Sequence, residues 1–324
     1  MQPHFGMRLA FIAWALTLSR APHLPAQGLP PWRPINPIVT SRSVLGFIPL
    51  VDRDSGWKLD TFLDYGSLVE FTKRDHAQIV LDAEVLRLET RVGRWIGRNT
   101  FVRANVGLWG AYAGFLDPIL NRYHRLLGVD QLRRNDRPND VFDYGILLPD
   151  GTTVVRDRTG TALADVDVSV GVRHNENLQT ALTVGLPVST GTPGYGLEAV
   201  AVGVVTTARS NPMGRLRLEA SGGLGISPTA GELEAWQRNV MVAASAGGRF
   251  RFWGRQSIYA NVFYHSPLYH STTLPAMDAG DVSLDAGFLL RSSDRGPELV
   301  AGVVEDLYSV GPAVDLVIRL GVRW

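Results

Sequence analysis

Apolar and polar residues alternate along most of this chain, and this period of two constrains its fold more than any other feature. Over residues 314–324 every even position holds Val, Leu, Ile or Trp, whereas Asp315, Arg319 and Arg323 occupy odd positions. The same alternation recurs over 165–173 and 215–221. Successive side chains of a strand point to opposite faces, so these segments predict strands with one apolar and one polar face.

Twelve segments fit this pattern. They are 57–66, 77–89, 99–110, 163–173, 177–188, 195–207, 214–225, 237–251, 255–265, 280–291, 297–307 and 313–324. Their connections alternate in length: 174–176, 252–254 and 292–296 are short, whereas 111–162 and 266–279 are long. Short turns at one end and long loops at the other are typical of a transmembrane β-barrel. We therefore predict an all-β, antiparallel, up-and-down transmembrane barrel of about twelve strands, spanning 56–324.

A soluble two-sheet sandwich is the alternative fold, because its strands also alternate. The apolar face of a sandwich packs a core and is rich in large side chains. Here that face often carries small residues, as in Val240, Val242, Ala244 and Ala246, which favours the barrel. The aromatic Trp324, preceded by alternating apolar residues, has the form of the signal that the barrel-insertion machinery reads.

Composition excludes several other classes. Charged residues make up only 19% of the chain, the formal net charge is +1, and there are 34 Gly and no Cys. Low, balanced charge excludes a nucleic-acid-binding domain, so we expect no nucleic acid among the partners. The absence of Cys excludes disulfide scaffolds, thiolate metal sites and cysteine nucleophiles.

The first residues have the pattern of an export signal. Arg8 precedes an uncharged run over 9–19, and Arg20 with a stretch interrupted by prolines follows up to Ala26, so 1–26 is expected to be a secretory signal peptide. Residues 27–55 contain five prolines and are assigned to a Pro-rich periplasmic segment, although the sequence leaves open whether they enter the lumen. Export and a barrel together predict the outer membrane of a Gram-negative cell.

Several short motifs resemble a known family. They are Ile35-Asn36-Pro37, Gly46-Phe47-Ile48-Pro49, and Ala113-Gly114-Phe115-Leu116-Asp117 leading to His124, Leu127-Gly128, Arg134 and Pro138. The chain with these motifs resembles a family of uncharacterised Gram-negative outer-membrane β-barrels, catalogued as a domain of unknown function. The resemblance implies the location and the fold and brings no catalytic residues.

The long outer loop 111–162 contains the one predicted helix. Asp117 can cap it, Pro118 suits its first turn, and Gly128 ends it, with Ile119, Leu120 and Tyr123 on one apolar face. We expect this short helix to cover the outer mouth of the barrel. Arg133, Arg134 and Arg137 follow it as a solvated face or a contact for lipopolysaccharide phosphate.

Motifs for catalysis are weak, and we expect no enzyme, no cofactor and no metal. His265-Ser266 and His270-Ser271 invite comparison with the Ser–His site of outer-membrane phospholipases, but the His-x-Ser-Asn pattern of that family is absent. The chain has neither a His-Glu-x-x-His motif nor a Gly-x-Ser-x-Gly elbow.

The polar face of the strands predicts a charged lumen. Its central residues are expected to be Asp82, Glu84, Arg103, Asn105, Glu219, Asp285 and Arg319. If facing residues of the second and third strands sum to 187, Glu84 pairs with Arg103 and Asp82 with Asn105 across the lumen.

Together these features predict a monomer in contact with the lipid bilayer and lipopolysaccharide, acting as a narrow channel or facilitator for small polar solutes. A structural or adhesion barrel with a closed lumen and functional outer loops is the alternative, and a lipid-acting enzyme is the third reading. The sequence does not identify the solute.

Overall fold

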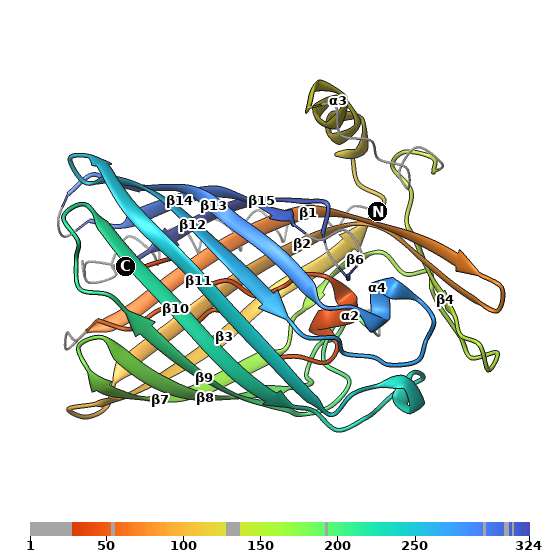
Figure 1. Ribbon diagram of the computed structural model, residues 1–324, viewed down its shortest axis with the longest axis horizontal. Coiled ribbons are helices and arrows are strands. Elements are labelled where there is room, and N and C mark those ends of the chain that lie inside the picture. The colour runs from red at the N-terminus through yellow and green to blue at the C-terminus, as the bar shows by residue number, and fades with distance from the viewer. Residues whose placement is uncertain are drawn as a thin grey trace, which may run out of the picture.

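A closed antiparallel β-barrel dominates the computed structural model, which describes residues 28–52, 56–127, 137–191, 194–293, 296–307, 311–312 and 314–324 (Figure 1). Within these residues twelve strands pair in sequence around the wall, and β1 pairs with β15 to close it. The wall strands are β1 (Trp57–Arg74), β2 (Ala77–Trp95), β3 (Thr100–Tyr112), β7 (Val166–Asn175), β8 (Leu178–Leu186), β9 (Ala201–Arg209), β10 (Leu216–Ile226), β11 (Val240–Trp253), β12 (Gln256–His265), β13 (Asp281–Arg291), β14 (Glu298–Asp306) and β15 (Leu316–Arg323). The predicted fold and strand number are therefore confirmed, but β1 and β2 extend past their predicted ends and β9 begins later than predicted.

The two faces of the wall differ as the alternation predicts. On β7, the side chains of Val168, Val170 and Val172 are exposed on the outside, whereas Asp167 and Ser169 between them are buried inside. Exposed apolar residues recur on the outside of other wall strands, as in Val204 of β9 and Ile318 of β15. A continuous apolar belt of this kind is the surface that a bilayer covers.

The two ends of the barrel have different connections. Short turns join β2 to β3, β7 to β8, and β11 to β12 at one end, which we call the short-turn end. The other end, the long-loop end, carries the connections that hold η1 (Glu234–Trp236) and α4 (Pro275–Asp278). No described helix is long and apolar enough to span a bilayer.

The region predicted as one long outer loop holds further strands. The hairpin of β1 and β2 continues past the rim, where β4 (Asp143–Leu147) pairs with β2 and β5 (Thr153–Arg156) pairs with β4 (Figure 1). The short β6 (Gly160–Leu163) pairs with β3. The barrel thus projects a small sheet at its long-loop end.

The predicted helix is present as α3 (Asp117–Leu127), but it does not cover the mouth. It stands off the barrel beside the rim (Figure 1), and the side chains of Ile119 and Leu126 are 57% and 78% exposed. The segment before it is held on the outer surface of the wall: Glu84 Oε1 accepts hydrogen bonds from the backbone N–H groups of Phe115, at 2.7 Å, and Leu116. The expectation of a lid over the mouth is therefore wrong. Arg133, Arg134 and Gly128 lie outside the described residues.

Candidate functional site: a hairpin inside the lumen

Residues 28–52 run through the interior of the barrel (Figure 1), and we call them the lumen hairpin. The segment enters at the short-turn end, where Gly28 O accepts from Arg323, and turns back at α2 (Pro37–Thr40). It returns to the same end at Asp52, whose carboxylate lies 2.8 Å from Arg209 Nη1. The sequence left the place of this segment open; the structure puts it in the lumen, and its assignment to the periplasm is wrong.

Local sequence explains the shape of the lumen hairpin. Asn36 caps α2 by accepting a hydrogen bond from Ile38 N at 2.9 Å, and Pro37 occupies the first helical position. Lower down, Trp32 and Phe47 exchange two backbone hydrogen bonds, of 3.3 and 2.7 Å, which join the two arms. The prolines prevent a regular ladder because they lack N–H donors.

Glycines in the wall make room for the apolar side chains of the lumen hairpin. A Cβ atom on Gly203 would lie 2.9 Å from Leu45 Cδ2, and one on Gly225 would lie 3.1 Å from the same side chain. A Cβ atom on Gly185 would lie 2.3 Å from Val44 Cγ1. These inward-facing glycines of the wall therefore accommodate the lumen hairpin.

Side chains of the wall satisfy the backbone of the lumen hairpin. Arg87 donates to the carbonyls of Arg33 and Pro34 at 2.8 and 2.9 Å, and Arg319 donates to that of Pro31. On the returning arm, further donors are Thr207 to Ile48 O, Gln179 to Pro49 O, Arg209 to Leu50 O and Arg173 to Val51 O. Backbone groups removed from water must be paired, and here polar wall residues pair them.

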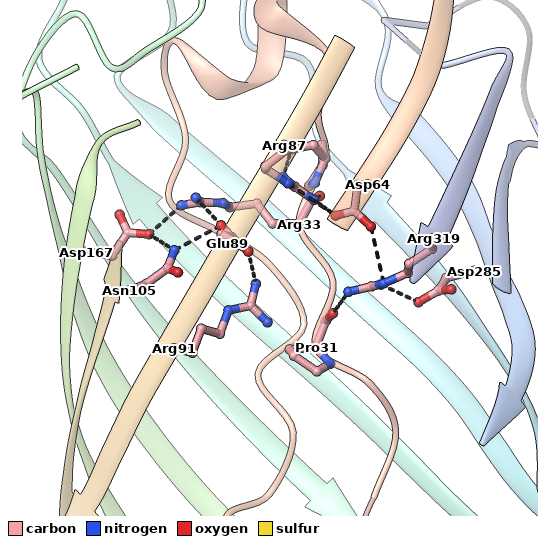
Figure 2. A network of polar contacts seen from close by, with 11 residues as sticks. Pro31, Arg33, Asp64, Arg87, Glu89, Arg91, Asn105, Asp167, Asp285 and Arg319 are labelled. Atoms are coloured by element: carbon pink, nitrogen blue, oxygen red, sulfur yellow. Dashed lines mark hydrogen bonds and ion pairs between the residues drawn. The ribbon is translucent and has the colours of Figure 1, made fainter. Parts of the chain in front are cut away.

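A network of ion pairs forms the centre of the site (Figure 2). Arg33 of the lumen hairpin bridges two strands, with Nη2 2.6 Å from Glu89 Oε1 and Nη1 2.5 Å from Asp167 Oδ2. Asn105 donates to both carboxylates, at 2.9 and 3.1 Å, and Arg91 Nη2 lies 2.6 Å from Glu89 Oε2. Glu89 therefore accepts hydrogen bonds from three side chains, one of which belongs to the lumen hairpin.

A second group of charges surrounds Trp32. Arg319 Nη1 lies 2.8 Å from Asp285 Oδ2, and Arg87 Nη2 lies 2.8 Å from Asp64 Oδ2 (Figure 2). The guanidinium carbons of Arg87 and Arg319 lie 5.4 and 5.1 Å from the centre of the Trp32 ring. Cation–π attraction therefore adds to the hydrogen bonds that hold this arm.

Little space remains beside the lumen hairpin. One cavity beside Arg33 and Asp165 has a volume of about 40 Å³, and another between Phe47 and Arg103 has a volume of about 40 Å³. Such volumes hold a few water molecules, since a single water needs roughly 10–15 Å³. These cavities do not admit a larger solute in this conformation.

The structure brings five of the seven predicted lumen residues inside the barrel. Asn105 contacts Glu89, Glu219 Oε1 lies 2.9 Å from Arg209 Nε, and Asp285 contacts Arg319, while Arg103 lines the cavity beside Phe47. Trp324 follows β15 and donates its backbone N–H to Leu59 O at 2.8 Å. Its role as an insertion signal stays a prediction.

Asp82 and Glu84 are not in the lumen, and this part of the prediction is wrong. Both lie on the outward face of β2: Asp82 Oδ2 is 3.0 Å from Arg137 Nε, and Glu84 accepts from Tyr65 Oη and from the segment before α3. The predicted register is also wrong. Facing residues of β2 and β3 sum to 196, so Arg103 faces Gly93 and Asn105 faces Arg91.

Arg33, Arg87, Glu89 and Arg91 were missed. Arg87, Glu89 and Arg91 share the inward face of β2, opposite to that of Asp82 and Glu84, because the outer half of β2 passes the rim and its polar face inverts there. Charged residues at every second position from 87 to 91 were the sequence signal that could have identified the three residues of β2. Arg33 had no such signal, because it lies outside any periodic segment.

The remaining chemical candidates have structural contacts. His265 is buried, with Nε2 2.7 Å from Ser43 Oγ of the lumen hairpin and Nδ1 2.8 Å from Ser266 O. Ser266 Oγ accepts from Val242 N at 2.9 Å. Among the described residues, no group of three or more His, Asp or Glu is arranged to hold a metal ion.

Comparisons with known proteins agree with this architecture. A family model described as "Protein of unknown function (DUF3187)" matches residues 65–324. No curated protein matches this chain significantly. The fold is similar to that of the COG4313 outer membrane channel from Pseudomonas putida F1, with 9% identity, a TM-score of 0.53, and coverage of 84% of this chain and 96% of that chain.

Other outer-membrane barrels are more distant. The toluene transporter TbuX from Ralstonia pickettii has 7% identity and a TM-score of 0.41, with 84% of this chain and 90% of that chain covered. A FadL homologue from Pseudomonas aeruginosa has 10% identity and a TM-score of 0.38, with 83% and 90% covered. Only the first likeness is strong enough to define a shared fold.

Proposed function

Because this chain belongs to the DUF3187 family, whose description assigns no function, we propose from its geometry that it is an outer-membrane channel for small polar solutes that the lumen hairpin closes. The observation that carries the proposal is the polar wall around this hairpin, with Glu89, Asp167 and Arg319 in contact with it. In this proposal residues 1–26 direct export, the apolar belt faces the bilayer and lipopolysaccharide, and the chain acts as a monomer without a catalytic step.

A polar interface suits a removable plug better than a permanent one. Replacing buried ion pairs with packed apolar residues is often neutral or stabilising, so a lumen that never opens gains little from so many buried charges. Once the lumen hairpin leaves, the same carboxylates and guanidinium groups are solvated by water that fills the pore. Both signs are present in the wall, so the pore would pass polar solutes.

Conductance in planar bilayers tests this function. We expect the refolded protein to be closed most of the time, and a variant that lacks residues 29–50 to form a steady pore. Heat-modifiable migration on a gel verifies that the deletion variant folds. A folded deletion variant that never conducts would contradict the proposal.

A reversible tether provides a second test with the full chain. The protein has no native cysteine, and the Cβ position of Gly203 lies beside Leu45. The double variant Leu45→Cys/Gly203→Cys should never open when oxidised and should regain the occasional openings of the wild type when reduced. Each single-cysteine variant is the matched control and should not respond to reductant.

A second candidate function rests on α3. The apolar side chains of Ile119 and Leu126 are exposed on α3, which stands beside the rim (Figure 1), and that of Phe115 is exposed just before it. Such a surface is suited to adhesion by the outer loops of a barrel whose lumen stays closed. This candidate is favoured if the deletion variant folds and does not conduct.

A further inference from the structure

Five arginines line an open pocket inside the barrel at the short-turn end. They are Arg215, Arg217, Arg249, Arg251 and Arg291, and the pocket has a volume of about 400 Å³. It is bounded by β10, β11, β12 and β13, on a part of the wall that the lumen hairpin does not fill. Among the described residues that line it, none is acidic.

Two of the arginine pairs face each other directly across neighbouring strands. Arg217 of β10 is the register partner of Arg249 of β11. One step nearer the rim, Arg251 N donates to Arg215 O at 2.9 Å, which makes these two the next facing pair. All four share the inward face with Glu219, and like charges directly opposite each other destabilise a sheet. The facing arginines therefore need negative charge close to them.

Among the described residues, one buried carboxylate contacts two arginines of the cluster. Glu298 has a fully buried side chain, with Oε1 2.8 Å from Arg249 Nη1 and 3.3 Å from Arg291 Nη2, and Oε2 3.1 Å from Arg323 Nη1. One negative charge is therefore shared among three guanidinium groups. Arg215 and Arg251 complete the described lining, in which arginines are the only charged residues.

We propose that this pocket binds a small anion with two or more negative charges, carried on phosphate or carboxylate groups. Guanidinium groups bind both through paired N–H donors, and low-dielectric walls focus the positive field into the pocket. A volume of about 400 Å³ lies at the lower end of small-molecule sites, which favours a compact anion over a polymer. The proposal concerns binding and holds whether or not the barrel conducts.

Calorimetry on the full refolded protein in detergent micelles tests the site, with pyrophosphate and citrate as separate probes. At matched ionic strength we expect saturable binding of at least one probe, and sodium chloride should give none. Binding of pyrophosphate alone identifies phosphate chemistry, and binding of citrate alone identifies carboxylate chemistry. Absence of saturable binding for both would overturn the proposal.

A pair of double variants separates a binding role from a folding role. Arg215→Gln/Arg251→Gln should weaken probe binding at least tenfold and, without probe, should raise the midpoint of thermal unfolding, because like-charge repulsion is relieved. The matched control Arg94→Gln/Arg98→Gln removes two charges at the same end of the barrel outside this pocket and should leave binding unchanged. Equal loss of binding in both variants, or a lowered unfolding midpoint in the first, would overturn the proposal.

Discussion

Arg33 Nη2 of the lumen hairpin lies 2.6 Å from Glu89 Oε1 of β2, so one ion pair joins the lumen hairpin to the wall. The side chain of Glu89 is 2% exposed and that of Arg33 is 17% exposed. The same guanidinium reaches Asp167 of β7, on the far side of β3. A single hairpin residue therefore ties together two separated strands of the wall.

Loss of this pair should favour the open pore. Arg33→Gln leaves two carboxylates without their hairpin partner, and removal of one member of a fully buried pair costs about 3–5 kcal/mol. Because Arg33 is partly exposed, we expect the smaller end of this range. Single-channel recording should show a higher open probability, which Glu89→Gln in the same chain partly reverses. Arg74→Gln, at the tip of the projecting hairpin, serves as the control; unchanged gating in Arg33→Gln would contradict the role of the pair.

The close approach of Leu45 to Gly203 predicts a compensating pair of substitutions. Gly203→Val places side-chain atoms where Leu45 now lies, and overpacking of this kind typically costs about 1–3 kcal/mol. The variant should release the lumen hairpin and raise the open probability. Leu45→Ala in the same chain frees the space and should restore closure. If the double variant is as open as Gly203→Val, the two side chains do not compete for one space.

An introduced charge should lower the free energy of unfolding more on the outward face of the wall than on the inward face. Leu218→Arg or Ile318→Arg places a charge on the apolar belt, at a cost of about 2–4 kcal/mol near the bilayer midplane. Ser221→Arg, on the inward face, should cost less from desolvation. Chemical unfolding in lipid vesicles measures both free energies. Equal losses would mean that the belt does not contact lipid.

The observed register can be checked by cross-linking, because the chain has no native cysteine. Thr90 and Val106 are direct partners on β2 and β3, so Thr90→Cys/Val106→Cys should form a disulfide under mild oxidation. Glu84→Cys/Arg103→Cys, the pair that the sequence predicted, should not. Digestion and mass spectrometry identify the linked peptides, and the reverse outcome would restore the register in which facing residues sum to 187.

Glu198, in the loop between β8 and β9 that contacts the tip of the lumen hairpin, should make the stability of the protein depend on pH. Burial raises the pKa of Glu198, although Gln237 Nε2 donates to its carboxylate at 2.8 Å. A raised carboxyl pKa means that the folded state binds the proton more tightly than the unfolded state. This contribution to stability is complete below the ordinary pKa of glutamate and is lost as the pH rises through the raised value.

Thermal unfolding measured between pH 4 and 7 tests this dependence. Glu198→Gln should flatten the fall in the unfolding midpoint across this window. Glu232→Gln, in the same region but half exposed, is the matched control and should retain the fall. A wild-type unfolding midpoint that rises between pH 4 and 7, with the rise removed by Glu198→Gln, would contradict a raised pKa of Glu198.

Alternation in the sequence was sufficient to identify the wall. All twelve strands, the outward apolar face and the helix at Asp117 follow from local patterns, because the direction of a side chain depends only on its position within the strand. Arg103, Asn105, Glu219, Asp285 and Arg319 were placed in the lumen for the same reason. The same reasoning placed Asp82 and Glu84 on the wrong face of β2. The polar face inverts along this strand, and alternation does not show where a strand passes the rim.

The register and the closed lumen required the tertiary structure. β2 continues to Trp95 and turns over the residues around Gly97 and Asn99, which moves every facing position on β3 away from the predicted sum. The lumen hairpin has no periodic pattern, and its place depends on wall side chains that lie far apart in the sequence, such as Arg87, Asp167 and Arg319. Closure of the barrel brings these groups together around Arg33 and the backbone carbonyls of the lumen hairpin, and only that long-range geometry determines how the lumen is closed.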